Sequence, residues 1–184
     1  MRAWNCHFGR CYQRDFQLAP KEARLMKQLI LMAGIPGSGK STWCRSYQKT
    51  HPNVYIIDTD ETRKKITGSY LIFPERMEII FDEMIRESNE IFAREKGDCT
   101  VIEDSIFLDD YRRNYYMDRL KGYDRSLLFM IKMHDYSICH QRNRMRPKEK
   151  WVPDDVIDRM VQIYQDPSPE TAKRFDEIKI EYWN

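Results

Sequence analysis

Residues 34–41 of the chain form the sequence Gly-Ile-Pro-Gly-Ser-Gly-Lys-Ser, which matches the pattern G-x-x-x-x-G-K-[S/T]. Glycines at this spacing let the backbone turn so that successive N–H groups point inward at phosphate oxygens. The lysine then reaches the β- and γ-phosphates of a nucleoside triphosphate, and the hydroxyl that follows it is a ligand for Mg²⁺. We therefore predict a site for ATP, or another nucleoside triphosphate, with magnesium. Its residues are Gly34, Pro36, Gly37, Ser38, Gly39, Lys40, Ser41 and Thr42, of which Lys40 is also catalytic and Ser41 also a metal ligand.

The segments on either side of this phosphate-binding loop (P-loop) support the same interpretation. A continuous apolar run, residues 29–33, precedes the loop, and a segment with helical character, residues 42–48, follows it. A strand that leads through a glycine-rich turn into a helix is the context that the motif requires. The alternative is a glycine-rich turn with a chance Lys-Ser pair, and the flanking segments disfavour it.

A carboxylate and an arginine follow the second apolar run, residues 54–57. Asp60 comes shortly after this run, and Arg63 follows one helical turn later. A carboxylate here can accept the proton of an attacking hydroxyl, and an arginine on the same helix face can pair with an anionic part of the acceptor. We predict Asp60 as the catalytic base and both residues as substrate-binding. The structural alternative is that Asp60 caps a helix at residues 61–67 and that Arg63 is solvated.

A basic run at residues 142–150 has the composition of a lid over the triphosphate. Arg142 and Arg146 are four residues apart, so they share a face if the helix continues as far as Pro147. An arginine that stabilises the charge on a transferring phosphoryl group is worth about 10³–10⁵ in rate. We predict that Arg142 and Arg146 bind the nucleotide and that Arg146 is catalytic. The alternative is a solvated charged surface.

Two acidic residues, Glu103 and Asp104, end a third apolar run at residues 100–102. Successive side chains of a strand point to opposite faces, so we expect Glu103 to point away from the P-loop. Asp104 is therefore the predicted metal residue, together with Ser41.

Strand-like and helical segments alternate along the chain, which predicts a parallel sheet wrapped by helices. We expect an α/β P-loop kinase fold with four to five strands and an arginine-rich lid. Ligands of such sheets collect at the carboxyl ends of the strands, where the P-loop, Asp60 and Asp104 all fall. The expected strands are 28–33, 54–57, 100–102, 127–131 and 177–182. The expected helices are 42 to about 50, 61–67, 74–97, 109–121, 135–146 and one from 153 to about 167.

Composition limits the class of protein. The chain has 184 residues, a formal net charge of +2 and five cysteines without paired spacing. This length predicts one catalytic domain at 26–184 and a peripheral basic N-terminal arm at 1–25. The scattered cysteines favour reduced thiols, and no apolar stretch approaches the length of a membrane span. We expect a cytoplasmic protein with no membrane partner.

Taken in order, these motifs resemble the kinase domain of the bacteriophage-type 5′-hydroxyl polynucleotide kinases over residues 28–165. The resemblance implies that Asp60 is the base on the 5′-hydroxyl end of RNA or DNA and that Arg63 holds the phosphate of the terminal nucleotide. It also implies that Arg142 and Arg146 lie on the phosphates of ATP, and it suggests a role in nucleic acid repair. The matching pieces are residues 34–43, Asp60 with Arg63, residues 102–105, Arg142-Asn143 with Arg146, and residues 152–156.

Two other functions fit the same residues. The segment Asp58-Thr59-Asp60-x-x-Arg63 also resembles small-molecule hydroxyl kinases that act on shikimate, gluconate or adenylylsulfate, and the near-neutral charge of the chain favours these slightly. A nucleotide-binding ATPase that is not a kinase is the third reading. It is disfavoured because a base for an acceptor hydroxyl and a lid would then serve no purpose.

Overall fold

The computed structural model describes residues 25–184. The basic arm expected at 1–25 lies outside this range except for its last residue. Among the described residues, five parallel strands form one sheet in the order β2-β3-β1-β4-β5. The strands are β1 (Lys27–Ala33), β2 (Val54–Asp58), β3 (Cys99–Asp104), β4 (Arg125–Met133) and β5 (Glu177–Trp183). The prediction of a parallel α/β sheet with four to five strands is confirmed.

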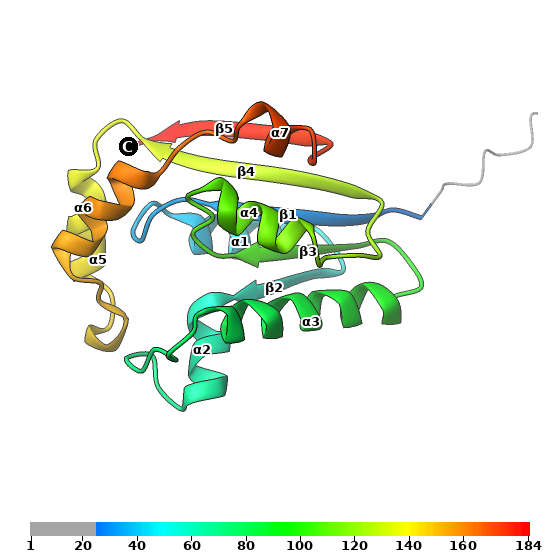
Figure 1. The fold of residues 1–184 in the computed structure, drawn as a ribbon, viewed down its shortest axis with the longest axis horizontal. Helices are drawn as coiled ribbons and strands as arrows, with labels where there is room; N and C mark the ends of the chain where they lie inside the picture. The colour runs from blue at the N-terminus through cyan, green and yellow to red at the C-terminus, as the bar shows by residue number, and fades with distance from the viewer. Residues whose placement is uncertain (1–24) are drawn as a thin grey trace, which may run out of the picture.

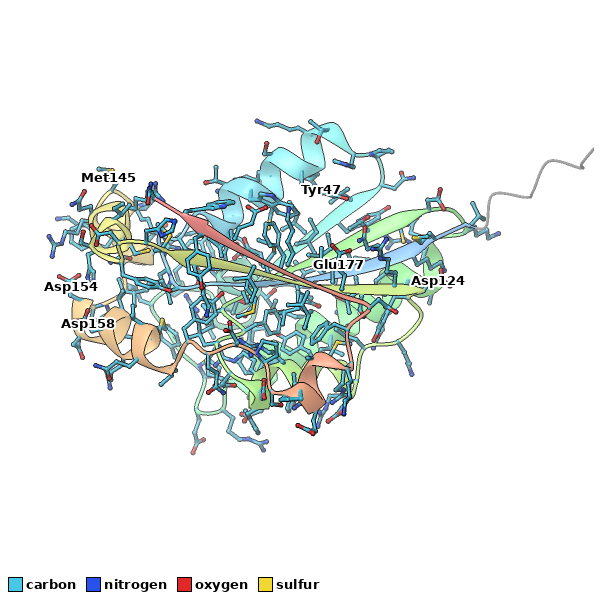
Figure 2. All side chains as sticks on the ribbon, turned by 90° about the horizontal axis from the view of Figure 1, so that it is seen from above. Tyr47, Asp124, Met145, Asp154, Asp158 and Glu177 are labelled. Atoms are coloured by element: carbon cyan, nitrogen blue, oxygen red, sulfur yellow. The ribbon has the colours of Figure 1, made fainter. Side chains whose placement is uncertain are left out.

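Helices cover both faces of this sheet. Figure 2 shows α1 on one side, and α4 and α7 on the other, where α3 also lies (Figure 1). The helices are α1 (Lys40–Thr50), α2 (Thr59–Thr67), α3 (Glu78–Arg94), α4 (Asp110–Met117), α5 (Ser137–Arg144), α6 (Asp154–Ile163) and α7 (Pro169–Ala172), with a 3₁₀ turn, η1, at Lys148–Lys150. Within residues 25–184, none of the helices has both the length and the apolar character needed to cross a bilayer.

The central strands are apolar without interruption because helices bury them on both faces. Residues 29–33 of β1 are at most 1% exposed. On one face Trp43 of α1 packs edge-on against Phe129 of β4, with 4.7 Å between the ring centroids. On the other face Tyr116 of α4 packs in the same way against Phe107, at 4.7 Å. Strand β5 is an edge strand, which explains why its apolar residues alternate with polar ones.

The structure corrects several predicted helix boundaries. Helix α3 begins at Glu78 and not at Pro74, and α4 ends at Met117 and not at residue 121. Residues 68–77 form a connecting loop, because Gly68 ends α2 in the left-handed conformation, at φ 79°. Helix α7 is not among the predicted helices, because a proline at position 169 also predicts the end of a helix. Proline is well suited to the first turn of a helix, and Ser168 caps α7 by accepting from the N–H of Thr171.

Candidate active site

The P-loop, residues 34–39, joins β1 to α1 at the carboxyl end of the sheet. The predicted binding residues Lys40, Ser41 and Thr42 form the first turn of α1, which has no acidic residue. The positive end of the helix therefore remains available to a phosphate. The other predicted residues of the nucleotide site, Gly34 to Gly39, form the loop itself.

Two glycines of this loop leave no room for a side chain. At Gly37, with φ 80°, a Cβ atom would lie 2.5 Å from the carbonyl oxygen of Cys139 in α5. At Gly39, with φ 98°, it would lie 3.0 Å from the Trp183 ring of β5. The P-loop is thus in contact with two segments more than a hundred residues away in the sequence, and its glycines permit that approach.

The side chain of Lys40 lies inside the loop. Only 8% of the residue is exposed, and Nζ donates to the carbonyl oxygen of Ile35 at 3.1 Å. Burial lowers the pKa of Lys40, and the negative charge of Asp104 opposes that shift. A lysine whose side chain lies inside the P-loop has the position from which the lysine of this motif binds phosphate oxygens.

Three buried oxygen atoms near the P-loop have no hydrogen-bond partner among residues 25–184. They are Ser38 Oγ, Asp104 Oδ2 and Ser105 Oγ. Unpaired buried polar atoms are costly, so they are expected where a ligand completes the site.

Hydroxyl and carboxylate oxygens of this kind suit Mg²⁺, and Ser41 with Asp104 would hold the ion. Among the described residues no three His, Cys, Asp or Glu side chains form a complete metal cage. Magnesium does not need one, since it is usually bound through one or two carboxylates together with the phosphates of the substrate.

The carboxylates at the ends of β2 and β3 have separate tasks. Asp58 lies beside Asp104 in the register of the two strands. Its Oδ1 caps α2 by accepting from the N–H groups of Asp60 and Glu61, at 2.8 and 3.0 Å. Burial, with the charge of Asp104, raises the pKa of Asp58 to about 6. The alternative that Asp60 caps this helix is wrong, since Asp58 does so.

Glu103 points away from the site, as strand alternation predicts. The residue is fully buried, and Oε1 accepts from Ser88 Oγ of α3. Burial raises the pKa of Glu103 to about 8. This carboxyl group therefore belongs to the core and not to the phosphate site.

Both oxygens of Asp60 are paired with arginines. Oδ1 accepts from Arg63 Nη2 at 2.8 Å, and Oδ2 accepts from Arg146 Nη2 at 2.9 Å. Arg63 is not a solvated residue, because only 6% of it is exposed and its Nε donates to the carbonyl oxygen of Tyr70 at 3.1 Å. Its guanidinium carbon also lies 4.3 Å from the centre of the Phe73 ring. Three predicted site residues thus meet in one cluster.

The lid consists of α5, η1 and the loop between them. Helix α5 ends at Arg144, before Arg146. Arg142 and Arg146 therefore do not share a helix face, because the helix does not continue as far as Pro147. Arg142 Nη2 donates to the carbonyl oxygen of Asn184 at 2.9 Å. Arg142 Nη1 lies 3.5 Å from the carbonyl oxygen of Gly37. Arg142 is therefore on the P-loop side, whereas Arg146 is on the Asp60 side.

Sequence reasoning missed two residues that hold the lid in place. Asn143 is buried, and its side chain bonds both the carbonyl oxygen and the N–H of Val152, at 2.7 and 3.1 Å. Lys150 pairs with Glu61 of α2 at 2.7 Å and lies 4.1 Å from the centre of the Tyr70 ring. The signals for them were the basic character of the run, for Lys150, and the family motif that includes Asn143, and neither identifies individual contacts.

The lid and α2 therefore face each other beyond the carboxyl ends of the strands. Figure 1 shows α5 and α6 on one side of this end of the sheet and α2 on the other. A salt bridge between Arg144 and Asp154 attaches α5 to α6, and the ring nitrogens of His140 contact Asp154 and Asp158 at 3.1 and 3.0 Å. Both aspartates lie on α6 beside the lid in Figure 2.

A family model described as an AAA domain, AAA_33, matches residues 29–167 of the chain. The chain is also similar to the L-seryl-tRNA(Sec) kinase of Methanococcus maripaludis, with 24% identity over 160 residues. That match covers 83% of this chain and 58% of the archaeal kinase. The chain thus spans little more than half the length of this relative.

Solved structures with a similar fold include Kti12 of Chaetomium thermophilum in complex with ADP-AlF3, with a TM-score of 0.60 and 16% identity, covering 85% of this chain and 89% of that one. A chain of the Pnkp1/Rnl/Hen1 RNA repair complex has a TM-score of 0.63 and 17% identity, and the match covers 86% of this chain and 49% of that one. A gluconokinase from Sinorhizobium meliloti 1021 has a TM-score of 0.55 and 16% identity, and the match covers 86% of this chain and 84% of that one. At these identities the likeness shows the fold alone.

Proposed function

This chain belongs to the AAA_33 family of AAA domains and has the fold of P-loop kinases, and we propose that it transfers the γ-phosphoryl group of ATP to the 5′-hydroxyl end of an RNA or DNA strand. The cluster of Asp60, Arg63 and Arg146 supports this proposal most directly. A carboxylate held between an arginine on α2 and an arginine of the lid has a task in a kinase, where a hydroxyl must lose its proton. An ATPase that activates water has no need of a separate acceptor side.

In the proposed reaction, the hydroxyl oxygen attacks the γ-phosphorus and its proton passes to the Asp60 carboxylate. The new P–O bond forms as the bond to the bridging β–γ oxygen breaks, and ADP leaves. Lys40 and Arg142 bind the phosphates from the P-loop side. Mg²⁺, when bound, neutralises the β- and γ-phosphate oxygens.

Arg146 has two anionic partners in this scheme. In the structure it pairs with Asp60, and the γ-phosphate would compete for the same guanidinium. When Arg146 moves onto the phosphate, one oxygen of Asp60 is released and becomes able to accept a proton. Binding of the donor would in this way prepare the base.

The choice of a polynucleotide as acceptor rests on two similarities. One relative is named as a kinase of a tRNA-bound serine, and one structural neighbour belongs to an RNA repair complex. Both concern RNA, and the motif resemblance to 5′-hydroxyl polynucleotide kinases agrees with them. A role in nucleic acid repair is part of this proposal.

A small-molecule hydroxyl kinase is the second candidate. The match to the gluconokinase covers 84% of that chain, whereas the match within the RNA repair complex covers 49%. A fold shared over nearly the whole of a small enzyme is the observation that favours this candidate.

One experiment separates the candidates. The purified full chain is incubated with radiolabelled ATP and Mg²⁺ and, separately, with short RNA and DNA strands that carry a 5′-hydroxyl, with gluconate, shikimate or adenylylsulfate, or with no acceptor. We expect label on the 5′ end of a strand and none on the same strand already 5′-phosphorylated. Asp60→Ala should lower the rate by about 10²–10⁴. Label on a small molecule alone would exclude the polynucleotide, and acceptor-free hydrolysis that Asp60→Ala leaves unchanged would exclude a kinase.

A further inference from the structure

The loop at residues 68–77, between α2 and α3, exposes three apolar side chains in succession. Leu71, Ile72 and Phe73 are 63%, 55% and 61% exposed. Isolated exposed apolar residues are common, but a consecutive apolar run on the surface indicates a binding site. The loop connects directly to the cluster around Asp60, because Arg63 contacts both.

Phe73 is the member of this run that has a defined orientation. One face of its ring is covered by the Arg63 guanidinium, whose central carbon is 4.3 Å from the ring centroid. Arg63 is in turn fixed by Asp60 and by the carbonyl oxygen of Tyr70. The ring therefore lies on a buried, immobilised side chain, and the residue nevertheless remains mostly exposed.

An exposed aromatic ring with a fixed orientation is suited to stacking with another flat group. Proteins that bind single-stranded nucleic acid combine such rings with positive charge along the backbone, because every base has a π-face. Basic side chains lie here: Lys64 is 4.5 Å from the centre of the Tyr70 ring, and Arg146 and Lys150 of the lid reach α2, where they pair with Asp60 and Glu61. The combination is complementary to a base with its attached phosphates.

We propose that the terminal nucleobase of the acceptor strand stacks on the face of Phe73 that is opposite Arg63. This inference rests on the proposed function and specifies how the acceptor is held. Base, Phe73 and Arg63 would form one continuous stack, and Arg63 connects that stack to Asp60. Phe73 is a positioning residue, since it acts through the base and not on the reacting atoms. Acceptors that lack a base would lose this contact.

The test compares Phe73→Leu and Phe73→Trp with the wild-type protein. Leucine keeps the apolar character but has no flat ring, whereas tryptophan keeps the ring. We expect Phe73→Leu to raise the KM for a 5′-hydroxyl strand about tenfold or more with little change in kcat, and Phe73→Trp to retain the wild-type KM. Leu71→Ala is the matched control, because it removes an equally exposed apolar side chain from the same loop.

A strand whose 5′-terminal nucleotide lacks a base provides the second arm. The wild-type protein should phosphorylate it with a raised KM, and Phe73→Leu should not raise that KM further. Binding of ADP, measured by fluorescence, and the melting temperature should be equal in all variants. If Phe73→Leu keeps the wild-type KM, or the abasic strand is as good a substrate, the stacking inference is wrong although the enzyme is a polynucleotide kinase. If the wild-type protein labels no strand at all, the proposed function fails, and that result is visible without any variant.

Discussion

Asp60 and Arg146 are separated by 86 residues in the sequence, yet Arg146 Nη2 donates to Oδ2 of Asp60 at 2.9 Å. The salt bridge joins the lid to the start of α2, on the side of the site that we propose for the acceptor. Lys150 and Glu61 form a second bridge beside it, at 2.7 Å. The lid is thus joined to α2 by two salt bridges.

Arg146→Ala should lower kcat by about 10³ or more, because no other group in the proposed scheme links the lid to both Asp60 and the transferring phosphoryl group. Steady-state kinetics with a 5′-hydroxyl strand give kcat, and fluorescence titration gives the affinity for ADP, which should change much less. Arg144→Ala is the matched control, since Arg144 pairs with Asp154 on the surface of the lid. Equal losses in the two variants would show that Arg146 acts only by holding the lid together.

Gly37→Ala should abolish nucleotide binding. The new methyl group would lie 2.5 Å from the carbonyl oxygen of Cys139, so α5 and the P-loop would have to separate. Gly68→Ala is the control: Gly68 has nearly the same φ, 79°, but nothing lies within 4 Å of the added carbon. In both variants the free energy of unfolding should fall by about 1–2 kcal/mol, because alanine is disfavoured in the left-handed conformation. Only Gly37→Ala should also lose ADP affinity, measured by calorimetry.

Asp104→Asn should raise the Mg²⁺ concentration needed for half-maximal activity, because an amide is a weaker ligand than a carboxylate for a hard cation. Activity measured across a magnesium series tests this. The neighbouring Glu103→Gln is the control, since that side chain points into the core toward Ser88. An unchanged magnesium requirement in Asp104→Asn would remove Asp104 from the metal site.

The raised pKa of Glu103 predicts how the stability of the protein depends on pH. Burial is the largest cause that raises its pKa, from 4.5 to about 8; Glu87 adds to the shift and the hydrogen bond from Ser88 opposes it. The folded state therefore binds this proton more tightly than the unfolded state. The stabilisation is complete below the unfolded pKa and is lost as the pH rises through about 8.

Glu103→Gln should accordingly flatten the decline in melting temperature as the pH rises from about 5 to about 8. At the upper end of that range the variant should melt higher than the wild-type protein, because no charge has to be buried. The difference between the two melting curves isolates Glu103 from other titrating groups. A difference that is constant with pH would mean that Glu103 titrates normally.

Much of the donor site could be predicted because its signals are local. The P-loop needs particular residues within one turn, with an apolar strand before it and a helix after it, so residues 29–48 carry the whole pattern. The uninterrupted apolar runs indicated a parallel sheet for the same reason, since burial on both faces leaves no polar position. Asp60 and Arg63 are one helical turn apart, and that spacing predicted a shared helix face; their bond to each other was not expected, since Arg63 was predicted to pair with an anionic part of the acceptor.

Contacts between distant segments could not be read in this way. The bridge from Arg146 to Asp60, the approach of Cys139 to Gly37, and the hydrogen bonds from Asn143 to Val152 depend on how the lid turns after Arg144. No periodicity encodes such a turn, because it is the packing of α5 on the P-loop and on α6 that selects it. The sequence by itself determined a phosphate-binding loop in a parallel sheet and a nearby carboxylate. The tertiary structure decided which arginine reaches that carboxylate, and it placed Phe73 on Arg63, because both depend on side chains that meet only once the sheet and its helices have packed.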